Sequence, residues 1–162
     1  MRVIPLEFEP RQNGRPRVIK ASVDVRGWWV LNRVQFVVDT GSHRTILGPI
    51  EWTIVNQIWN GSFPYPDPAN ANGIAVMAPP SDQFGTMGGT ADLKRGPNAE
   101  ITLYLAAGTY HINLDTIWFS PHENVTPVLG MDALDKGKLV VEGASHDMLT
   151  NGGQPRGVLV YA

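Results

Sequence analysis

Short runs of apolar residues, separated by glycine and proline, dominate the pattern along this chain. In one run, Ile101, Leu103 and Leu105 alternate with Thr102 and Tyr104, which is the spacing of a β-strand with one buried face. Other runs are rich in valine, isoleucine, threonine and aromatic residues, which also favour strands. Strands are expected at residues 2–8, 17–25, 28–38, 73–78, 99–105, 110–119 and 156–161.

Helical signals are few. Residues 131–136 predict a short helix, because Asp132 falls in its first turn and Gly137 follows directly after a lysine. Residues 49–59 predict a second short helix. The chain has 17 glycines and 13 prolines among 162 residues, so long helices are not expected. This length fits one domain, and the pattern makes that domain mostly β.

Residues 60–81 differ from the rest of the chain. They contain five prolines together with several asparagines and glycines, a composition that predicts a long surface excursion. Long excursions from compact domains are commonly functional. A tolerated insertion explains the composition equally well, so both interpretations stay open.

Composition excludes several functional classes. Hydrophobic residues make up 43% of the chain and charged residues 17%, which is enough apolar surface for a core. The net charge is −2 and no stripe of lysine and arginine predicts binding to nucleic acid or an anionic membrane. No apolar run suits a secretory signal or a membrane-spanning helix. A cytoplasmic protein is expected, or a domain released from a larger one. The absence of cysteine excludes disulfides, thiolate nucleophiles and cysteine zinc sites.

The stretch with the clearest chemistry lies at the end of a predicted strand, where an apolar run delivers Asp39 and is followed by Thr40, Gly41 and Ser42. The Gly41 N–H can donate to the Asp39 carboxylate, and the Thr40 hydroxyl can reach a neighbouring loop. The Ser42 hydroxyl can donate to the outer carboxylate oxygen, which favours the charged form. A strand-end aspartate in an Asx-turn is the structural alternative.

Residues 36–47, FVVDTGSHRTIL, resemble the active-site loop of the aspartic peptidases, especially the single-domain retropepsin-like branch. That family continues with a buried apolar pair, here Ile46 and Leu47. It also requires a later apolar–apolar–glycine before a short helix, which residues 128–130 supply. The resemblance implies that Asp39 is catalytic and that Gly130 lets one strand pass close to the catalytic loop. It also implies a closed acid-protease-type β-barrel with one short C-terminal helix.

The family also has a flap, a glycine-rich β-hairpin that closes over the substrate. Residues 85–90 lie between the other two motifs and match it in place and type; a plain turn is the alternative. The resemblance therefore implies flap and substrate-binding roles for Gly85, Thr86, Met87, Gly88 and Gly89. Residues 51–81 exceed what a minimal member of the family needs. They are expected to be an insertion or an extension of the flap, or to border the cleft or the dimer edge.

The sequence contains one Asp-Thr-Gly, since Asp115 and Thr116 are followed by Ile117. Hydrolysis through a water needs an acid and a base, which two adjacent carboxylates sharing one proton provide. A homodimer with a two-fold axis would place Asp39 beside its own copy. The resemblance also implies an intersubunit sheet formed by residues 3–8 and 157–161, with pairing inside one subunit as the alternative.

Three further expectations concern the surroundings of the loop. An ion pair between Arg44 and Asp132 is expected to buttress it, and the Ser42 hydrogen bond predicts an acidic pH optimum. Neither a metal nor another cofactor is expected, because the histidines lack metal-ligand spacing. These histidines are His43, His111, His122 and His146.

Together these patterns predict a homodimeric aspartic endopeptidase that acts on extended peptide or protein substrates. The first alternative is a non-catalytic β-barrel module of the same ancestry, used for peptide binding or assembly. The second is an unrelated β-sandwich interaction domain in which the motif arose by chance.

Overall fold

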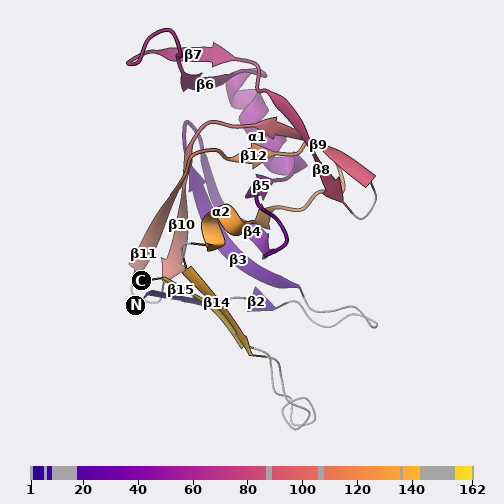
Figure 1. The fold of residues 1–162 in the computed structure, drawn as a ribbon, viewed down its shortest axis with the longest axis vertical. Helices are drawn as coiled ribbons and strands as arrows, with labels where there is room; N and C mark the ends of the chain where they lie inside the picture. Colours follow the sequence, from indigo (N-terminus) through magenta and orange to yellow (C-terminus); the bar gives the residue numbers. More distant parts are fainter. Residues whose placement is uncertain are drawn as a thin grey trace.

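β-Strands make up most of the regular secondary structure that the computed structural model describes (Figure 1). The structure describes residues 2–5, 7–8, 18–86, 89–105, 108–135, 137–142 and 156–161. The strands are β1 (Arg2–Pro5), β2 (Glu7–Phe8), β3 (Ile19–Arg26), β4 (Val30–Val38), β5 (Ile46–Leu47), β6 (Phe63–Pro66), β7 (Ile74–Met77), β8 (Ser81–Thr86), β9 (Gly89–Arg95), β10 (Ala99–Leu105), β11 (Gly108–Leu114), β12 (Trp118–Phe119), β13 (Val128–Leu129), β14 (Gly137–Glu142) and β15 (Arg156–Tyr161). The helices are α1 (Pro49–Trp59) and α2 (Met131–Leu134).

A ten-stranded sheet forms the body of the molecule. Its neighbouring strands run in the order β11-β10-β3-β4-β13-β5-β12-β9-β8, and β2 pairs with β3. Strand β13 lies parallel to β4, with Val128 opposite Val37 and Leu129 opposite Val38. The segment that leads into α2 therefore runs directly beside the strand that ends at Asp39.

This sheet is open. Within the described residues its order ends at β11 on one side and at β8 on the other, and these strands lie on opposite sides of the molecule in Figure 1. Among the described residues, the β8–β9 hairpin pairs with the rest of the sheet through the two residues of β12, Trp118 opposite Arg95 and Phe119 opposite Lys94. In the described sheet order, β8 and β11 do not pair with each other. The expected closed barrel is wrong, whereas the mostly β class is confirmed.

The core contains a cluster of four aromatic rings drawn from distant parts of the chain. The Phe119 ring centroid lies 5.5 Å from that of Trp29, 5.8 Å from Trp52 and 5.7 Å from Phe63. The Trp29 and Phe119 rings meet edge to face, an arrangement that adds about 0.5–1.5 kcal/mol to the burial energy of a pair. The cluster joins the sheet to α1 and to the first strand of the β6–β7 hairpin.

Helix α1 spans the predicted residues 49–59 and has clear end signals. Pro49 occupies the first helical position, and the Glu51 carboxylate accepts the Gly48 N–H at 3.0 Å. Asn60 ends the helix in the left-handed conformation, at φ 49°. Val55 is fully buried and faces the core. A second helix besides α2 differs from the family expectation of one short C-terminal helix.

The β6–β7 hairpin lies within residues 51–81, the segment expected to be an insertion or a flap extension. Figure 1 places this hairpin above α1, at the end of the molecule away from β14 and β15. The Tyr65 hydroxyl donates to the Arg95 carbonyl, which ties the hairpin to the last residue of β9. Burial raises the pKa of Tyr65 to about 12, so this phenol stays protonated and keeps donating at neutral pH.

The two terminal segments form a separate three-stranded sheet in the order β1-β15-β14. Arg2 lies opposite Tyr161, and the antiparallel register continues to Pro5 opposite Val158. The terminal strands therefore pair within one chain, as the alternative interpretation has it. None of the helices in the described ranges is long and apolar enough to cross a membrane.

Candidate active site

Asp39 lies where the chain turns out of the sheet at the end of β4. Its N–H donates to the Leu129 carbonyl at 3.1 Å, and the Val37 N–H donates to the Pro127 carbonyl at 2.8 Å. These two bonds tie the end of β4 to a segment about 90 residues further along the chain. The position of Asp39 is thus fixed by two strands and not by its own turn alone.

The Asp39 side chain is exposed and is held by a local hydrogen bond. The Gly41 N–H donates to its Oδ1 at 2.8 Å, as the sequence predicts. A Cβ at position 41 would lie 3.1 Å from the same oxygen, so a side chain there would crowd this bond. The geometry fits an Asx-turn, and it also presents a fixed carboxylate to solvent.

The Ser42 hydroxyl does not support Asp39 in the expected way. It donates to the Arg44 carbonyl at 2.8 Å and accepts the Arg44 N–H at 3.4 Å. A hydroxyl in this position spans the loop instead of reaching the outer carboxylate oxygen. The predicted Ser42–Asp39 bond is therefore wrong, and the acidic pH optimum loses the premise on which it was based.

Thr40 follows Asp39 directly and is exposed. Its hydroxyl was expected to reach a neighbouring loop. Among the residues that the structure describes, this side chain makes no such hydrogen bond.

Gly130 lies where the segment entering α2 passes the loop that follows Asp39. A Cβ built on Gly130 would lie 2.3 Å from the Arg44 carbonyl oxygen, 2.5 Å from its carbon and 2.9 Å from its nitrogen. These are backbone atoms and cannot rotate away. The close passage predicted for this glycine is present.

Asp132, in the first turn of α2, braces the same loop through Thr45. Its Oδ2 accepts the Thr45 N–H at 3.0 Å, and its Oδ1 accepts the Thr45 hydroxyl at 2.6 Å. The Thr45 oxygen in turn accepts the Gly130 N–H at 3.2 Å. Asp132 was expected to pair with Arg44, and that expectation is wrong because its two oxygens are taken by Thr45.

Replacing Asp132 by asparagine is expected to lower the free energy of unfolding by about 2 kcal/mol. The asparagine amide has one acceptor oxygen, whereas the Thr45 N–H and the Thr45 hydroxyl both donate to the carboxylate. Because Thr45 is fully buried, one of these donors would lose its partner away from water. Urea unfolding followed by circular dichroism measures the change. Asp135→Asn, an exposed carboxylate just beyond the same helix, is the matched control and should cost less than about 0.5 kcal/mol. Equal effects of the two variants would contradict this account.

The β8–β9 hairpin faces the Asp39 loop across a cleft of about 370 Å³. Asp39 and residues 41–44 line one side, and Gln83, Phe84 and Gly85 line the other. Thr86 pairs with Gly89, whose φ of +123° suits glycine, near the tip of the hairpin. Met87 and Gly88, the rest of the expected flap tip, lie outside the described residues. No residue from 51–81 is among the described residues that line this cleft.

Asp39 is the one carboxylate among the described residues lining the cleft. A second aspartate, Asp24, is buried in β3, but it serves the fold. Its Oδ1 accepts the Arg33 N–H at 2.7 Å, and its Oδ2 accepts the Tyr104 hydroxyl. Arg33 adopts a positive φ of 54°, and its guanidinium lies over the Tyr104 ring. Asp24 is therefore engaged on both oxygens and is not a catalytic partner for Asp39.

Arg44 makes contacts that sequence reasoning missed. Its Nη2 lies 2.8 Å from Asp82 Oδ2 in β8, and its guanidinium carbon lies 4.1 Å from the centre of the Trp118 ring. The hydrogen bond that the Gln83 N–H donates to Asp82 holds the pKa of this carboxyl below its ordinary value, and the hydrogen bond from Arg44 adds a smaller effect. The ion pair thus forms fully above the ordinary pKa of Asp82 and is lost only as pH falls through the lowered folded value. No short-range pattern links positions 44 and 82.

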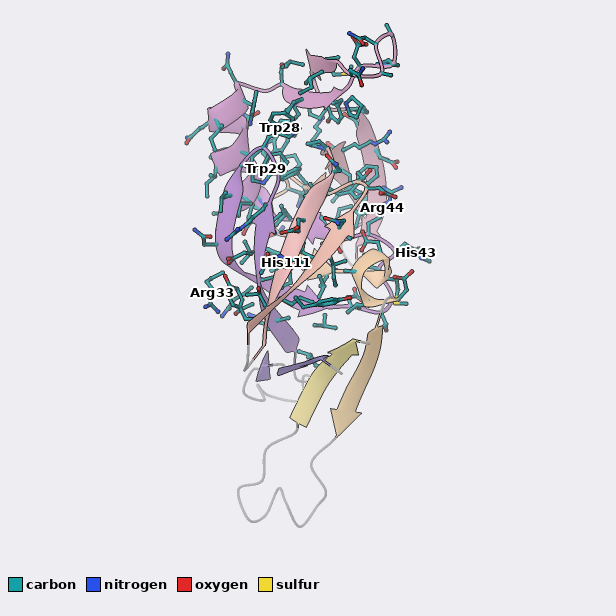
Figure 2. The ribbon with its side chains drawn as sticks, turned by 90° about the vertical axis from the view of Figure 1, so that its left-hand side faces the viewer. Trp28, Trp29, Arg33, His43, Arg44 and His111 are labelled. Atoms are coloured by element: carbon teal, nitrogen blue, oxygen red, sulfur yellow. The ribbon has the colours of Figure 1, made fainter. Side chains whose placement is uncertain are left out.

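A second polar cluster surrounds His111 on β10 and β11. His111 Nδ1 lies 2.8 Å from Glu100 Oε1, and its Nε2 lies 3.2 Å from the Thr109 hydroxyl. Figure 2 shows His111 on the β10–β11 ribbon, away from His43 and Arg44, so this cluster does not belong to the cleft. In the described ranges, no group of three histidine, aspartate or glutamate side chains is arranged to hold a metal ion.

Compared with known proteins, the sequence matches no protein-family model and shows no significant similarity to a curated protein.

Proposed function

We propose that this chain is one half of a homodimeric, retropepsin-like aspartic endopeptidase with Asp39 as its catalytic residue. The observation that carries the proposal is the cleft in which an exposed, backbone-held carboxylate faces a β-hairpin. The close passage of Gly130 beside the same loop supports it, because the family resemblance demands both features together.

The proposed chemistry uses a water held between two Asp39 carboxylates, one from each chain. Like charges so close do not both ionise, so the pair shares one proton. The ionised carboxylate takes a proton from the water while the water oxygen attacks the peptide carbonyl carbon. The protonated carboxyl gives its proton to the carbonyl oxygen. Collapse of the resulting tetrahedral diol, with proton transfer to the nitrogen, breaks the C–N bond.

A two-fold axis next to Asp39 is the simplest way to complete this site. Two observations favour it over a site within one chain: Asp39 is exposed, and the described cleft residues include no second carboxylate. Thr40, which is exposed and follows Asp39 directly, is then proposed to contact the partner's loop. The terminal sheet pairs within one chain, so the dimer is proposed to rest on the loop surface and not on exchanged terminal strands.

The proposed substrate is an extended peptide or protein segment. Strand β8 ends the sheet order, so among the described strands it has one unpaired edge. An extended peptide can add to such an edge through backbone hydrogen bonds, while side-chain pockets supply specificity. Gln83, Phe84 and Gly85 of this strand line the cleft beside Asp39.

The test is to incubate the wild type and Asp39→Asn with a diverse peptide library from pH 3 to 8 and to map cleavages by mass spectrometry. Both proteins are purified identically, so that the variant reports any contaminating peptidase. Cleavage by the wild type alone is the expected result. Equal cleavage by both proteins, or none by either, rejects the enzyme. Specific peptide binding without cleavage would favour the non-catalytic module.

A further inference from the structure

Arg44 connects the candidate catalytic loop to the hairpin that faces it. Its backbone carbonyl accepts the Ser42 hydroxyl at 2.8 Å and lies against Gly130. Its side chain crosses to β8 and meets Asp82 at 2.8 Å. The loop thus holds the backbone of Arg44, and the hairpin holds the end of its side chain. Figure 2 shows Arg44 beside His43, on the side of the molecule that carries α2.

Each partner of this ion pair is held by a further contact. Exposed pairs usually contribute little because two long side chains must be fixed in one geometry. Here the guanidinium lies 4.1 Å from the Trp118 ring centre, and the Gln83 N–H at 2.8 Å holds the other Asp82 oxygen. Both partners are therefore oriented before they meet. Among the described residues, the buried Arg44 Nη1 has no hydrogen-bond partner, a cost that argues for a role other than stability.

Asp82 lies at the root of the hairpin, opposite Leu93 and next to the β9 residues that join the sheet. From Asp82 to Thr86 the strand extends roughly 13 Å, at about 3.3 Å per residue. A change of about 10° at the root would therefore move Thr86 by roughly 2 Å. The angle at the root thus affects how far the described end of the hairpin lies from the cleft.

We propose that Arg44 is a positioning residue that, through Asp82, sets the angle of the β8–β9 hairpin over the Asp39 cleft. The link is a property of the folded chain, and its use in peptide hydrolysis rests on the function proposed above. Substrate bound between the Asp39 loop and the hairpin would contact both of the segments that the Arg44–Asp82 pair joins. Loss of the link would loosen the hairpin without removing a catalytic group.

The direct test is amide hydrogen exchange of the hairpin peptides in the intact protein. Asp82→Asn and Arg44→Gln should each speed exchange in residues 81–95 by about two- to fivefold. The double variant should be no faster than either single variant, and Asp82→Glu should restore slow exchange. Added salt should speed exchange in the wild type but not in Asp82→Asn. Ser81→Ala is the matched control, because Ser81 meets Lys94 of the hairpin itself at 2.7 Å.

Additive effects of the two substitutions, or exchange unchanged in both, would overturn the proposal. Faster exchange spread over the whole chain would do the same, because it indicates general destabilisation. Peptide cleavage is measured separately: kcat/KM should fall by about two- to fivefold in Asp82→Asn and recover in Asp82→Glu. If the exchange results hold but no variant cleaves peptide, the link stands and the proposed peptidase fails. If the variants cleave peptide like the wild type and exchange in the hairpin does not change, the proposed peptidase stands and the Arg44–Asp82 link fails.

Discussion

Replacing Gly130 by alanine is expected to lower the free energy of unfolding by about 3 kcal/mol. The added methyl group would lie 2.3–2.9 Å from three backbone atoms of Arg44, which cannot move without shifting the loop that carries Asp39. The φ of Gly130 is −96°, which any residue adopts. The whole effect is therefore steric, and backbone strain plays no part in it.

Urea unfolding of Gly130→Ala and of the wild type measures this difference through the midpoint and its slope. Gly85→Ala is the matched control for stability, because a Cβ at Gly85 meets no atom within 4 Å and its φ is not positive. That variant should be unchanged to within about 0.5 kcal/mol. A loss below about 1 kcal/mol in Gly130→Ala would show that the two segments separate easily.

Strands and helices with strong local patterns were predictable from the sequence. The alternation in residues 99–105 gave β10 with its observed bounds, and residues 49–59 are helix α1. Residues 110–119 were expected as one strand but form β11 and β12, separated by a bend. Strands β5 and β13 have two residues each, too few for any periodicity, and they exist because partners distant in sequence pair with them.

The candidate site was predictable where each residue acts on its own neighbours. The Gly41 bond to Asp39 spans two residues, and the spacing of the motif makes it necessary. Gly130 was found by its place in the family pattern. The errors concern choices between competing partners: the Ser42 hydroxyl prefers the Arg44 carbonyl, and Asp132 prefers Thr45. Such choices depend on ångström-scale placement, which sequence order does not specify.

The open sheet and the terminal sheet illustrate the same limit at a larger scale. Both were expected from the family pattern, in a closed barrel and in an intersubunit sheet. Closure depends on whether β8 and β11, the two ends of the described sheet order, pair with each other, and they do not. The partner of a terminal strand depends on whether its own chain can reach it, and here β15 lies between β1 and β14. Hydrophobic periodicity specifies neither which strands pair at the ends of a sheet nor which strand a terminal strand can reach.

A heterodimer of one wild-type chain and one Asp39→Asn chain is expected to lose peptide hydrolysis by at least about 10²-fold. The proposed mechanism needs an acid and a base at once, and a single carboxylate cannot act as both in the same step. Two independent active sites would instead leave half of the activity. The two hypotheses therefore differ by about 50-fold in one measurement.

The heterodimer is obtained by co-expressing the two chains with different affinity tags and purifying on both in turn. Its activity is compared with that of a doubly tagged wild-type dimer prepared in the same way. Asp115→Asn paired with wild type is the matched control: Asp115 is also exposed and followed by threonine, but Ile117 replaces the glycine. That control should keep full activity. Half-maximal activity in the Asp39→Asn heterodimer would mean that each chain works alone, and Asp39 would then need a second acid from within its own chain.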